Sequence, residues 1–199
     1  MKPDLTIAGL VLAAGESSRM GRDKALLTYH GHSFLETVVA TLRKAGLRQI
    51  VVVLGHHADE IRRAVELDDA EIVNNSDYRQ GQTSSLQAGL RALKTSAVEG
   101  IILALVDHPA VSDRVVRSLV QDFQESRAPV VIPTFQNRRG HPILIGRVLF
   151  AELLSLSAAE GANTVIRRYG DAARLVEVAD PAVLLDIDDP ESYGCLAGT

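Results

Sequence analysis

The strongest constraint on the fold is a series of unbroken apolar segments separated by segments with helical periodicity. The apolar segments are residues 7–12 (IAGLVL), 49–54 (QIVVVL, apolar after Gln49), 101–106 (IILALV) and 129–133 (PVVIP). A strand with one solvated face alternates apolar and polar residues, whereas a strand of a parallel sheet covered on both faces is apolar throughout. The pattern therefore predicts an α/β fold with a Rossmann-like, doubly wound and mostly parallel sheet.

The segments between these strands carry helix signals. Residues 33–45 have Ser33 as a candidate N-cap, Glu36 three residues later to complete a capping box, and Gly46 at the stop. Further helices are expected over 58–66, 83–94, 112–126, 147–155 and 161–169, and further strands over 70–74, 174–178 and 183–188. The looser pattern after residue 135 predicts a small C-terminal lobe added to the sheet.

Composition excludes several function classes. The net charge is −4, so no global positive field exists to hold a nucleic acid, and an aromatic content of 4% without tryptophan argues against a base-stacking platform. Cys195 is the single cysteine, which rules out a disulfide within the chain. The apolar N-terminal run follows Asp4 and fits a buried strand better than a signal segment, and no run is long enough to cross a bilayer. We expect a cytoplasmic protein with no membrane partner.

The loop after the first strand is the first candidate for chemistry. Residues 12–24 (LAAGESSRMGRDK) combine small residues, which allow close backbone approach, with the cations Arg19, Arg22 and Lys24. Ligands of such sheets bind outside the carboxyl ends of the strands, where backbone N–H groups can hold phosphate. The loop is neither an ATPase P-loop nor a GxGxxG dinucleotide loop. It predicts a phosphate site, and an ordinary turn with solvated arginines is the alternative.

Two groups of carboxylates are candidate metal ligands. Asp107 ends an apolar strand, where a carboxylate is costly unless it meets a cation or hydrogen-bond donors. Asp186 and Asp188 lie on one face if residues 183–188 are extended, and one of them could supply a second Mg²⁺ ligand. The alternatives are structural roles. Asp107 could instead lie in a turn or cap a helix. Asp186 and Asp188 could only terminate a strand, with Asp189 capping the last helix.

The histidines and serines give weaker signals. The pairs His30/His32 and His56/His57 lack zinc-site spacing, so solvated or capping roles are expected for them. Residues 17–18 (SS) are poor candidates for a hydrolase nucleophile, because the chain has no GxSxG elbow.

The motif LAAGxSxRMGxxK resembles the signature of the nucleotidyltransferases related to the molybdenum cofactor guanylyl- and cytidylyltransferases, the MobA-like NTP transferase family. The resemblance continues through residues 79–90 (RQGQTSSLQAGL), 105–109 (LVDHP), 139–145 (RGHPILI) and 186–193 (DIDDPESY). These blocks, in this order, are similar to the cytidylyltransferase branch, which makes molybdopterin cytosine dinucleotide. The resemblance implies the nucleotide-diphospho-sugar transferase type of fold, with nucleotide-binding residues 1–110 and acceptor-binding residues 111–199 in one domain.

The resemblance also implies roles for individual residues. Base and ribose would contact the backbone of Leu12, Ala13, Ala14 and Gly15, and the triphosphate would be bound by Arg19 and Lys24. The nucleotide would be bordered by Gly81, Ser84 and Ser85. The acceptor would be faced by Arg139, Gly140 and His141. Asp107 and, by similarity, Asp188 would hold Mg²⁺. Arg19, Lys24 and Asp107 are the expected catalytic residues. His108, where the family often has glutamine, is expected to line the site.

The activity implied is Mg²⁺-dependent transfer of CMP from CTP to the terminal phosphate of molybdenum cofactor, with release of pyrophosphate. Ala14 stands where the guanylyltransferase branch has glycine, which favours CTP over GTP. The implied partners are a pterin phosphate acceptor and a molybdoenzyme or its insertion chaperone. A related guanylyl- or sugar-phosphate nucleotidyltransferase, and a non-catalytic cofactor-binding maturation factor, are the alternatives.

Overall fold

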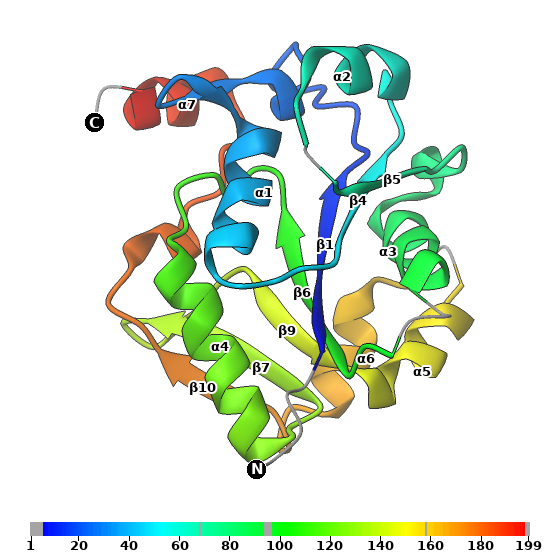
Figure 1. The fold of residues 1–199 in the computed structure, drawn as a ribbon, viewed down its shortest axis with the longest axis vertical. Helices are drawn as coiled ribbons and strands as arrows, with labels where there is room; N and C mark the ends of the chain where they lie inside the picture. The colour runs from blue at the N-terminus through cyan, green and yellow to red at the C-terminus, as the bar shows by residue number, and fades with distance from the viewer. Residues whose placement is uncertain (1–5, 68, 94–96, 158, 198–199) are drawn as a thin grey trace.

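The fold is built on one mostly parallel β-sheet (Figure 1). The computed structural model describes residues 6–67, 69–93, 97–157 and 159–197. The strand order is β10-β7-β9-β6-β1-β4-β5, with β8 paired to β7. The strands are β1 (Ile7–Ala13), β4 (Ile50–Leu54), β5 (Glu71–Asn74), β6 (Gly100–Leu105), β7 (Val130–Phe135), β8 (Arg138–Arg139), β9 (Ile143–Gly146) and β10 (Arg174–Glu177). The order confirms the predicted sheet, in which β9 runs antiparallel to β6 and β7.

Helices cover both faces of this sheet. Helices α1 (Phe34–Lys44) and α4 (Asp113–Ser126) pack on one face, and α3 (Gln82–Ala92), α5 (Phe150–Ser155) and α6 (Ala162–Arg168) on the other. Helices α2 (Ala58–Ala64) and α7 (Pro190–Ala197) lie near the carboxyl ends of the central strands, at the top of Figure 1. A short ribbon of β2 (Thr28–Tyr29) and β3 (His32–Ser33) precedes α1. No described helix combines the length and the apolar character needed to cross a membrane.

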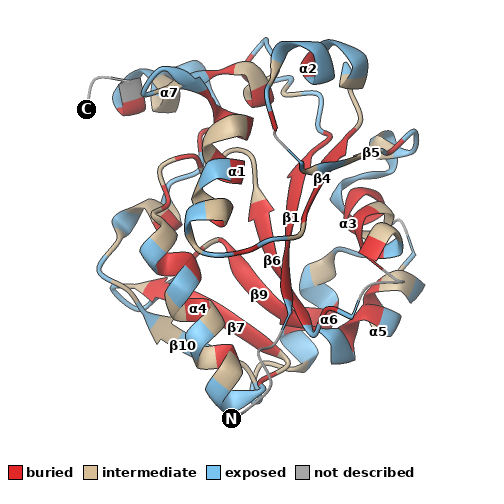
Figure 2. Cartoon of the chain, viewed as in Figure 1, coloured by how far each residue is buried: buried red, intermediate tan, exposed pale blue. Residues whose placement is uncertain are grey.

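The central strands are apolar throughout because they bury side chains in two cores. In β1, Val11 and Ala13 pack on the α1 and α4 side, while Leu10 and Leu12 pack on the α3 side. All seven residues of β1 are buried, as the red strand in Figure 2 shows. Successive side chains of a strand point to opposite faces of the sheet, and here both faces are covered. This accounts for the continuous apolar segments from which the sheet was predicted.

The helix prediction for residues 33–45 is confirmed in detail. The Ser33 hydroxyl accepts a hydrogen bond from the Glu36 backbone N–H, and the Glu36 carboxylate accepts one from the Ser33 N–H. This reciprocal cap satisfies two N–H groups that a helix end leaves unpaired.

The strand predicted over residues 183–188 is wrong. Pro181–Leu184 forms a 3-10 turn instead, and no strand follows it before α7. The Asp180 carboxylate accepts a hydrogen bond from the Ala182 N–H, and Pro181 fixes the first φ angle of the turn. The residues after 135, which were expected to form an added lobe, instead contribute β9 and β10 to the main sheet. Helices α5 and α6 from the same part of the chain pack on one face of that sheet.

The parallel order brings several loops together at the carboxyl ends of β1, β4 and β6. Backbone hydrogen bonds join these loops: the His56 N–H donates to the Ala14 carbonyl, and the Val106 N–H donates to the Leu12 carbonyl. The loops after three strands that are distant in sequence therefore surround one site.

Candidate active site

A cleft of about 360 Å³ opens at the carboxyl ends of β1 and β6. The end of β1 and the loop after it supply much of its wall, and α2, the turn before α3, the first turn of α3, the end of β6 and the segment before α7 supply the rest. The lining residues are Leu12, Ala13, Ala14, Gly15, Ser17, Ser18, Arg19, Asp23, Lys24, Ala25, Ile61, Tyr78, Gly81, Gln82, Ser85, Leu105, Val106, Asp107 and Asp188. Most of the residues expected to meet the nucleotide or the metal therefore share one cavity.

The most concentrated charge in the cleft is a group of four side chains. The Lys24 ammonium lies 3.2 Å from Asp107 Oδ2 and also donates to Asp188 Oδ1, and Arg19 pairs with Asp188 Oδ2 at 2.7 Å. The Lys24 side chain is 11% exposed, so this interaction is little screened by water. The hydrogen bond from Lys24 holds the pKa of Asp188 below its ordinary value, and Arg19 adds to the effect. Both cations keep the carboxylate ionised.

The loop that carries the two cations is held in a defined conformation. The Lys24 N–H donates to the Ser17 hydroxyl at 3.0 Å, across seven residues. Ser17 has φ of 50° and Gly21 has φ of 74°, so the chain turns twice through the left-handed region. Lys24 then opens a 3-10 turn (Lys24–Leu26), whose buried Ala25 anchors the end of the loop.

The turn before α3 and the first turn of this helix contribute to the cleft unequally. Gly81 and Ser85 line it, but Ser84 does not. The Ser84 hydroxyl donates to backbone carbonyls of the same turn and accepts from the buried Asn75 amide. Ser84 therefore holds the turn together, with Asn75 as the residue that ties β5 to α3.

The residues expected to face the acceptor lie outside this cleft. Arg139 is exposed on β8. Gly140 packs so closely that an added Cβ would come within 2.3 Å of the Val183 carbonyl oxygen. His141 is half-buried, with its ring 5.3 Å from that of His108, the neighbour of Asp107. Through His108, this segment adjoins the carboxylate end of the cleft.

Burial favours the neutral form of both of these imidazoles. Burial lowers the pKa of His108, an effect opposed by the charges of Asp107 and Asp186. Burial, together with neighbouring His108, lowers the pKa of His141 to about 4. Neither Nδ1 atom has a hydrogen-bond partner among the described residues.

The neutral state of His141 predicts a pH-dependent loss of stability. Between pH 6.5 and 4 the unfolded chain binds a proton at this residue that the folded chain does not, so the free energy of unfolding falls as the pH drops. The loss between pH 6.5 and 4.5 is on the order of 2–3 kcal/mol. Denaturant unfolding at both pH values measures it, and His141→Gln should remove most of it. Equal losses in the variant and the parent would contradict the assignment.

Several cleft residues were not predicted as site residues from the sequence. Ile61 lines the cleft from α2, Tyr78 from the turn before α3, and Gln82 from the first residue of α3. Gly55 could have indicated from the sequence that two loops approach each other here. A Cβ at this position would come within 2.6 Å of Tyr78 Cβ and 2.8 Å of the Ala14 carbonyl oxygen. A glycine directly after a buried strand marks this close approach of two loops.

Comparison with known proteins identifies the family of the chain. The MobA-like NTP transferase domain matches residues 9–173. The chain belongs to the MobA-like NTP transferase family. It is therefore a nucleotidyltransferase, which confirms the resemblance seen in the sequence.

Individual relatives cover nearly the whole chain. It is 32% identical to a protein named nicotine blue oxidoreductase from Paenarthrobacter nicotinovorans, over 93% of each chain. It is 26% identical to the molybdenum cofactor cytidylyltransferase of Escherichia coli, over 92% of each. A solved structure of Rv0371c in complex with manganese, from Mycobacterium tuberculosis, superposes with a TM-score of 0.80 at 29% identity, covering 98% of this chain and 99% of that one.

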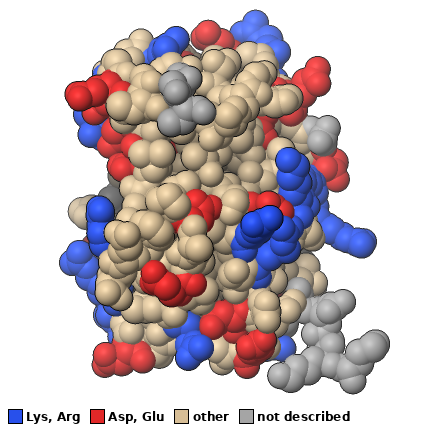
Figure 3. Space-filling view, turned by 90° about the vertical axis from the view of Figure 1, so that its left-hand side faces the viewer, with Lys and Arg blue, Asp and Glu red and all other residues tan. Residues whose placement is uncertain are grey.

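The surface of this MobA-like transferase carries charges of both signs. On the face shown in Figure 3, acidic side chains lie among the basic ones instead of leaving a continuous basic surface. A polyanion such as nucleic acid binds to continuous positive charge, which that face does not offer.

Proposed function

We propose that the chain transfers CMP from CTP to the terminal phosphate of molybdenum cofactor and releases pyrophosphate. The observation that carries the proposal is the position of Lys24 between Asp107 and Asp188 in a cleft at the carboxyl ends of the strands. A triphosphate needs cations for its oxygens, and a divalent metal needs carboxylates. The cleft offers both within a few ångströms.

The carboxylates fit a magnesium ion. Asp107 Oδ1 is buried and has no hydrogen-bond partner in the described part of the chain, so its lone pairs are unused. Oxygen donors are those that Mg²⁺ prefers. The manganese complex of Rv0371c supports a divalent ion in a related protein. Asp107 and Asp188 would hold the ion, which when bound would neutralise charge on the phosphate oxygens.

The chain's own residues position the reaction. Lys24 and Arg19 would balance the charge that develops on the leaving pyrophosphate. A bond forms between an oxygen of the acceptor phosphate and the α-phosphorus, and the bond from the α-phosphorus to the bridging oxygen breaks. The acceptor phosphate is ionised near pH 7, so the transfer needs no general base. Arg139 and His141, in the acceptor-binding part (residues 111–199), would guide the acceptor to the carboxylate end.

The backbone at Gly15 gives a test of nucleotide placement. An added Cβ there would meet no protein atom within 4 Å, because that side of the residue faces open space. Gly15→Ala should therefore leave stability within about 0.5 kcal/mol. If base or ribose packs there, affinity for CTP should fall about tenfold, since an added methyl group costs roughly 1–3 kcal/mol in a packed contact.

The matched control is Gly161→Ala, at another glycine whose Cβ would face open space. Titration calorimetry with CTP measures both variants. Unchanged CTP affinity in Gly15→Ala would place the base and ribose elsewhere.

Substrate choice tests the proposal itself. Pyrophosphate release should require molybdenum cofactor and proceed faster with CTP than with GTP, as Ala14 suggests. Faster release with GTP would identify a guanylyltransferase and overturn the interpretation of Ala14. Release that depends on a sugar phosphate would change the acceptor. Tight CTP binding without release would support a carrier.

The name of one relative favours a second candidate, an oxidoreductase. Such an activity would need a nicotinamide or flavin electron donor in the same cleft. The Lys24, Asp107 and Asp188 group has no evident role in hydride transfer, so we rank this candidate second. Dye reduction dependent on a nicotinamide nucleotide, without pyrophosphate release, would place it first.

A further inference from the structure

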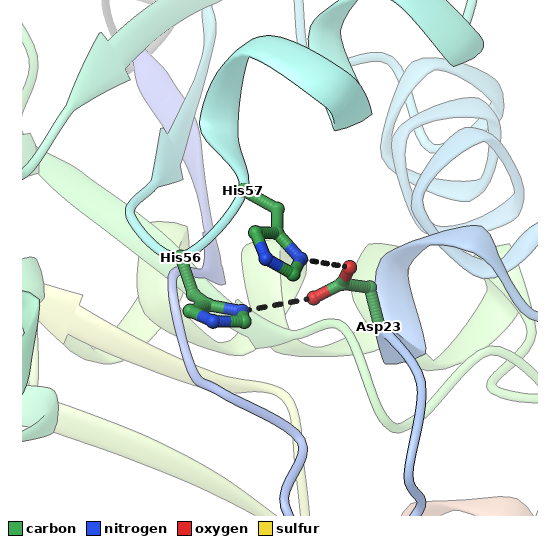
Figure 4. Close-up of side chains that lie close together, drawn as sticks. All are labelled: Asp23, His56 and His57. Carbon is green, nitrogen blue, oxygen red and sulfur yellow. Dashed lines mark hydrogen bonds and ion pairs between the residues drawn. The ribbon is translucent and has the colours of Figure 1, made fainter.

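A cluster outside the Asp107–Asp188 pair combines a carboxylate with two imidazoles (Figure 4). Asp23 comes from the loop after β1, and His56 and His57 come from the turn between β4 and α2. Asp23 Oδ1 lies 3.3 Å from His56 Nδ1, and Asp23 Oδ2 lies 2.9 Å from His57 Nδ1. The two imidazole rings stack with centroids 3.7 Å apart.

The three side chains lie close enough together to offer ligands to one cation. One donor atom from each residue can be chosen so that all three lie within 4.8 Å of one another. Ligands about 2.1 Å from a common ion are separated by roughly 3.0–3.4 Å, depending on coordination geometry. The two observed separations are close to this range. Small side-chain rotations would therefore let both nitrogens and one carboxylate oxygen face the same point.

The donor types select the class of cation. Imidazole suits Zn²⁺, Co²⁺ and Ni²⁺, whereas Mg²⁺ takes oxygen ligands. We propose that Asp23, His56 and His57 form a binding site for a transition-metal cation of the Zn²⁺, Co²⁺ and Ni²⁺ class, distinct from the two carboxylates proposed to hold Mg²⁺.

The local backbone is arranged around this cluster. His57 has φ of 49°, an uncommon conformation for a residue with a side chain, and it brings the ring to Asp23. The Asp23 side chain is 11% exposed and that of His57 is 53% exposed, so the site has a buried side and an open side. Water or another small ligand can complete the coordination from the open side.

A cation at this site would join two segments that form the cleft. Asp23 lines the cleft and directly precedes Lys24, and the His56 N–H donates to the Ala14 carbonyl. The bound cation would therefore tether the loop after β1 to the β4–α2 turn and add positive charge at the cleft edge. This role does not depend on which substrate the enzyme takes.

Direct metal binding tests the proposal without turnover. Titration calorimetry with Zn²⁺, and the visible absorption of Co²⁺, are measured on the full chain after chelator treatment, without nucleotide. His56→Gln and His57→Gln should each weaken Zn²⁺ binding more than about 100-fold, since even groups that merely support a ligand contribute 10–100-fold. Zn²⁺ should also raise the thermal unfolding midpoint of the parent but not of these variants.

Two controls separate this site from other ligands. His32→Gln alters the exposed His30/His32 pair and should bind Zn²⁺ like the parent. Asp107→Asn, which changes the proposed Mg²⁺ site, should also retain Zn²⁺ binding. Thermal unfolding in chelator shows that each variant is folded. Parent-like Zn²⁺ affinity in folded His56→Gln and His57→Gln, or loss of binding in Asp107→Asn instead, would overturn the proposal.

Discussion

Replacing Asp107 with asparagine should lower the rate of nucleotide transfer by about 10²–10³-fold, the loss typical when one electrostatic contact to the transition state is removed. Asparagine keeps the shape of the side chain but lacks the charge that would hold Mg²⁺. The Asp107 side chain is 22% exposed and asparagine has nearly the same volume, so the variant should stay folded. Steady-state kcat for pyrophosphate release measures the effect, with circular dichroism and the thermal midpoint to show the fold.

Asp171→Asn is the control, because Asp171 is exposed and lies outside the residues that line the cleft. It should leave kcat within twofold of the parent. A folded Asp107→Asn enzyme with near-normal kcat would refute the assignment of Asp107 as a metal-holding residue.

Replacing Lys24 with methionine should cause a loss of similar size, about 10²–10³-fold in kcat. Methionine fills nearly the same volume without the charge that would face the departing pyrophosphate. The change also removes the main cause of the lowered pKa of Asp188, so this pKa should rise toward its ordinary value. Rate measurements at saturating CTP separate this effect from weaker binding.

Arg22→Met is the matched control from the same loop. Arg22 does not line the cleft, and its guanidinium lies over the Tyr193 ring at 5.2 Å. We expect kcat of Arg22→Met to stay close to that of the parent. If both variants lose activity equally, the effect comes from the net charge of the loop and not from the position of Lys24.

The sequence was sufficient to predict the sheet and the grouping of its charged residues. Because parallel strands end at one edge, Lys24 after β1 and Asp107 after β6 had to lie close together. Asp188, which only the family resemblance had implied as a metal ligand, joins them, although the strand predicted over residues 183–188 is absent. A chain segment without regular secondary structure can still reach a site. The periodicity of the sequence does not predict the course of such a segment.

Other features depend on contacts that no local pattern encodes. The Ser84 hydroxyl turns inward because Asn75 and two carbonyls satisfy its hydrogen bonds. Asp23 meets His56 and His57 across more than 30 residues, so the spacing rules for metal motifs did not predict that cluster. Local sequence patterns predict most of the elements, and tertiary hydrogen bonds decide which side chains face the cleft.

The most direct test of the proposed reaction follows the fate of the labelled phosphates of CTP. The parent enzyme is incubated with Mg²⁺, molybdenum cofactor and CTP labelled at either the α- or the γ-phosphate, and the products are separated. Attack at the α-phosphorus predicts that the α-label enters the pterin product and the γ-label appears in pyrophosphate. A γ-label on the acceptor, or no label transfer from CTP while the enzyme binds it tightly, would contradict nucleotide transfer in this cleft.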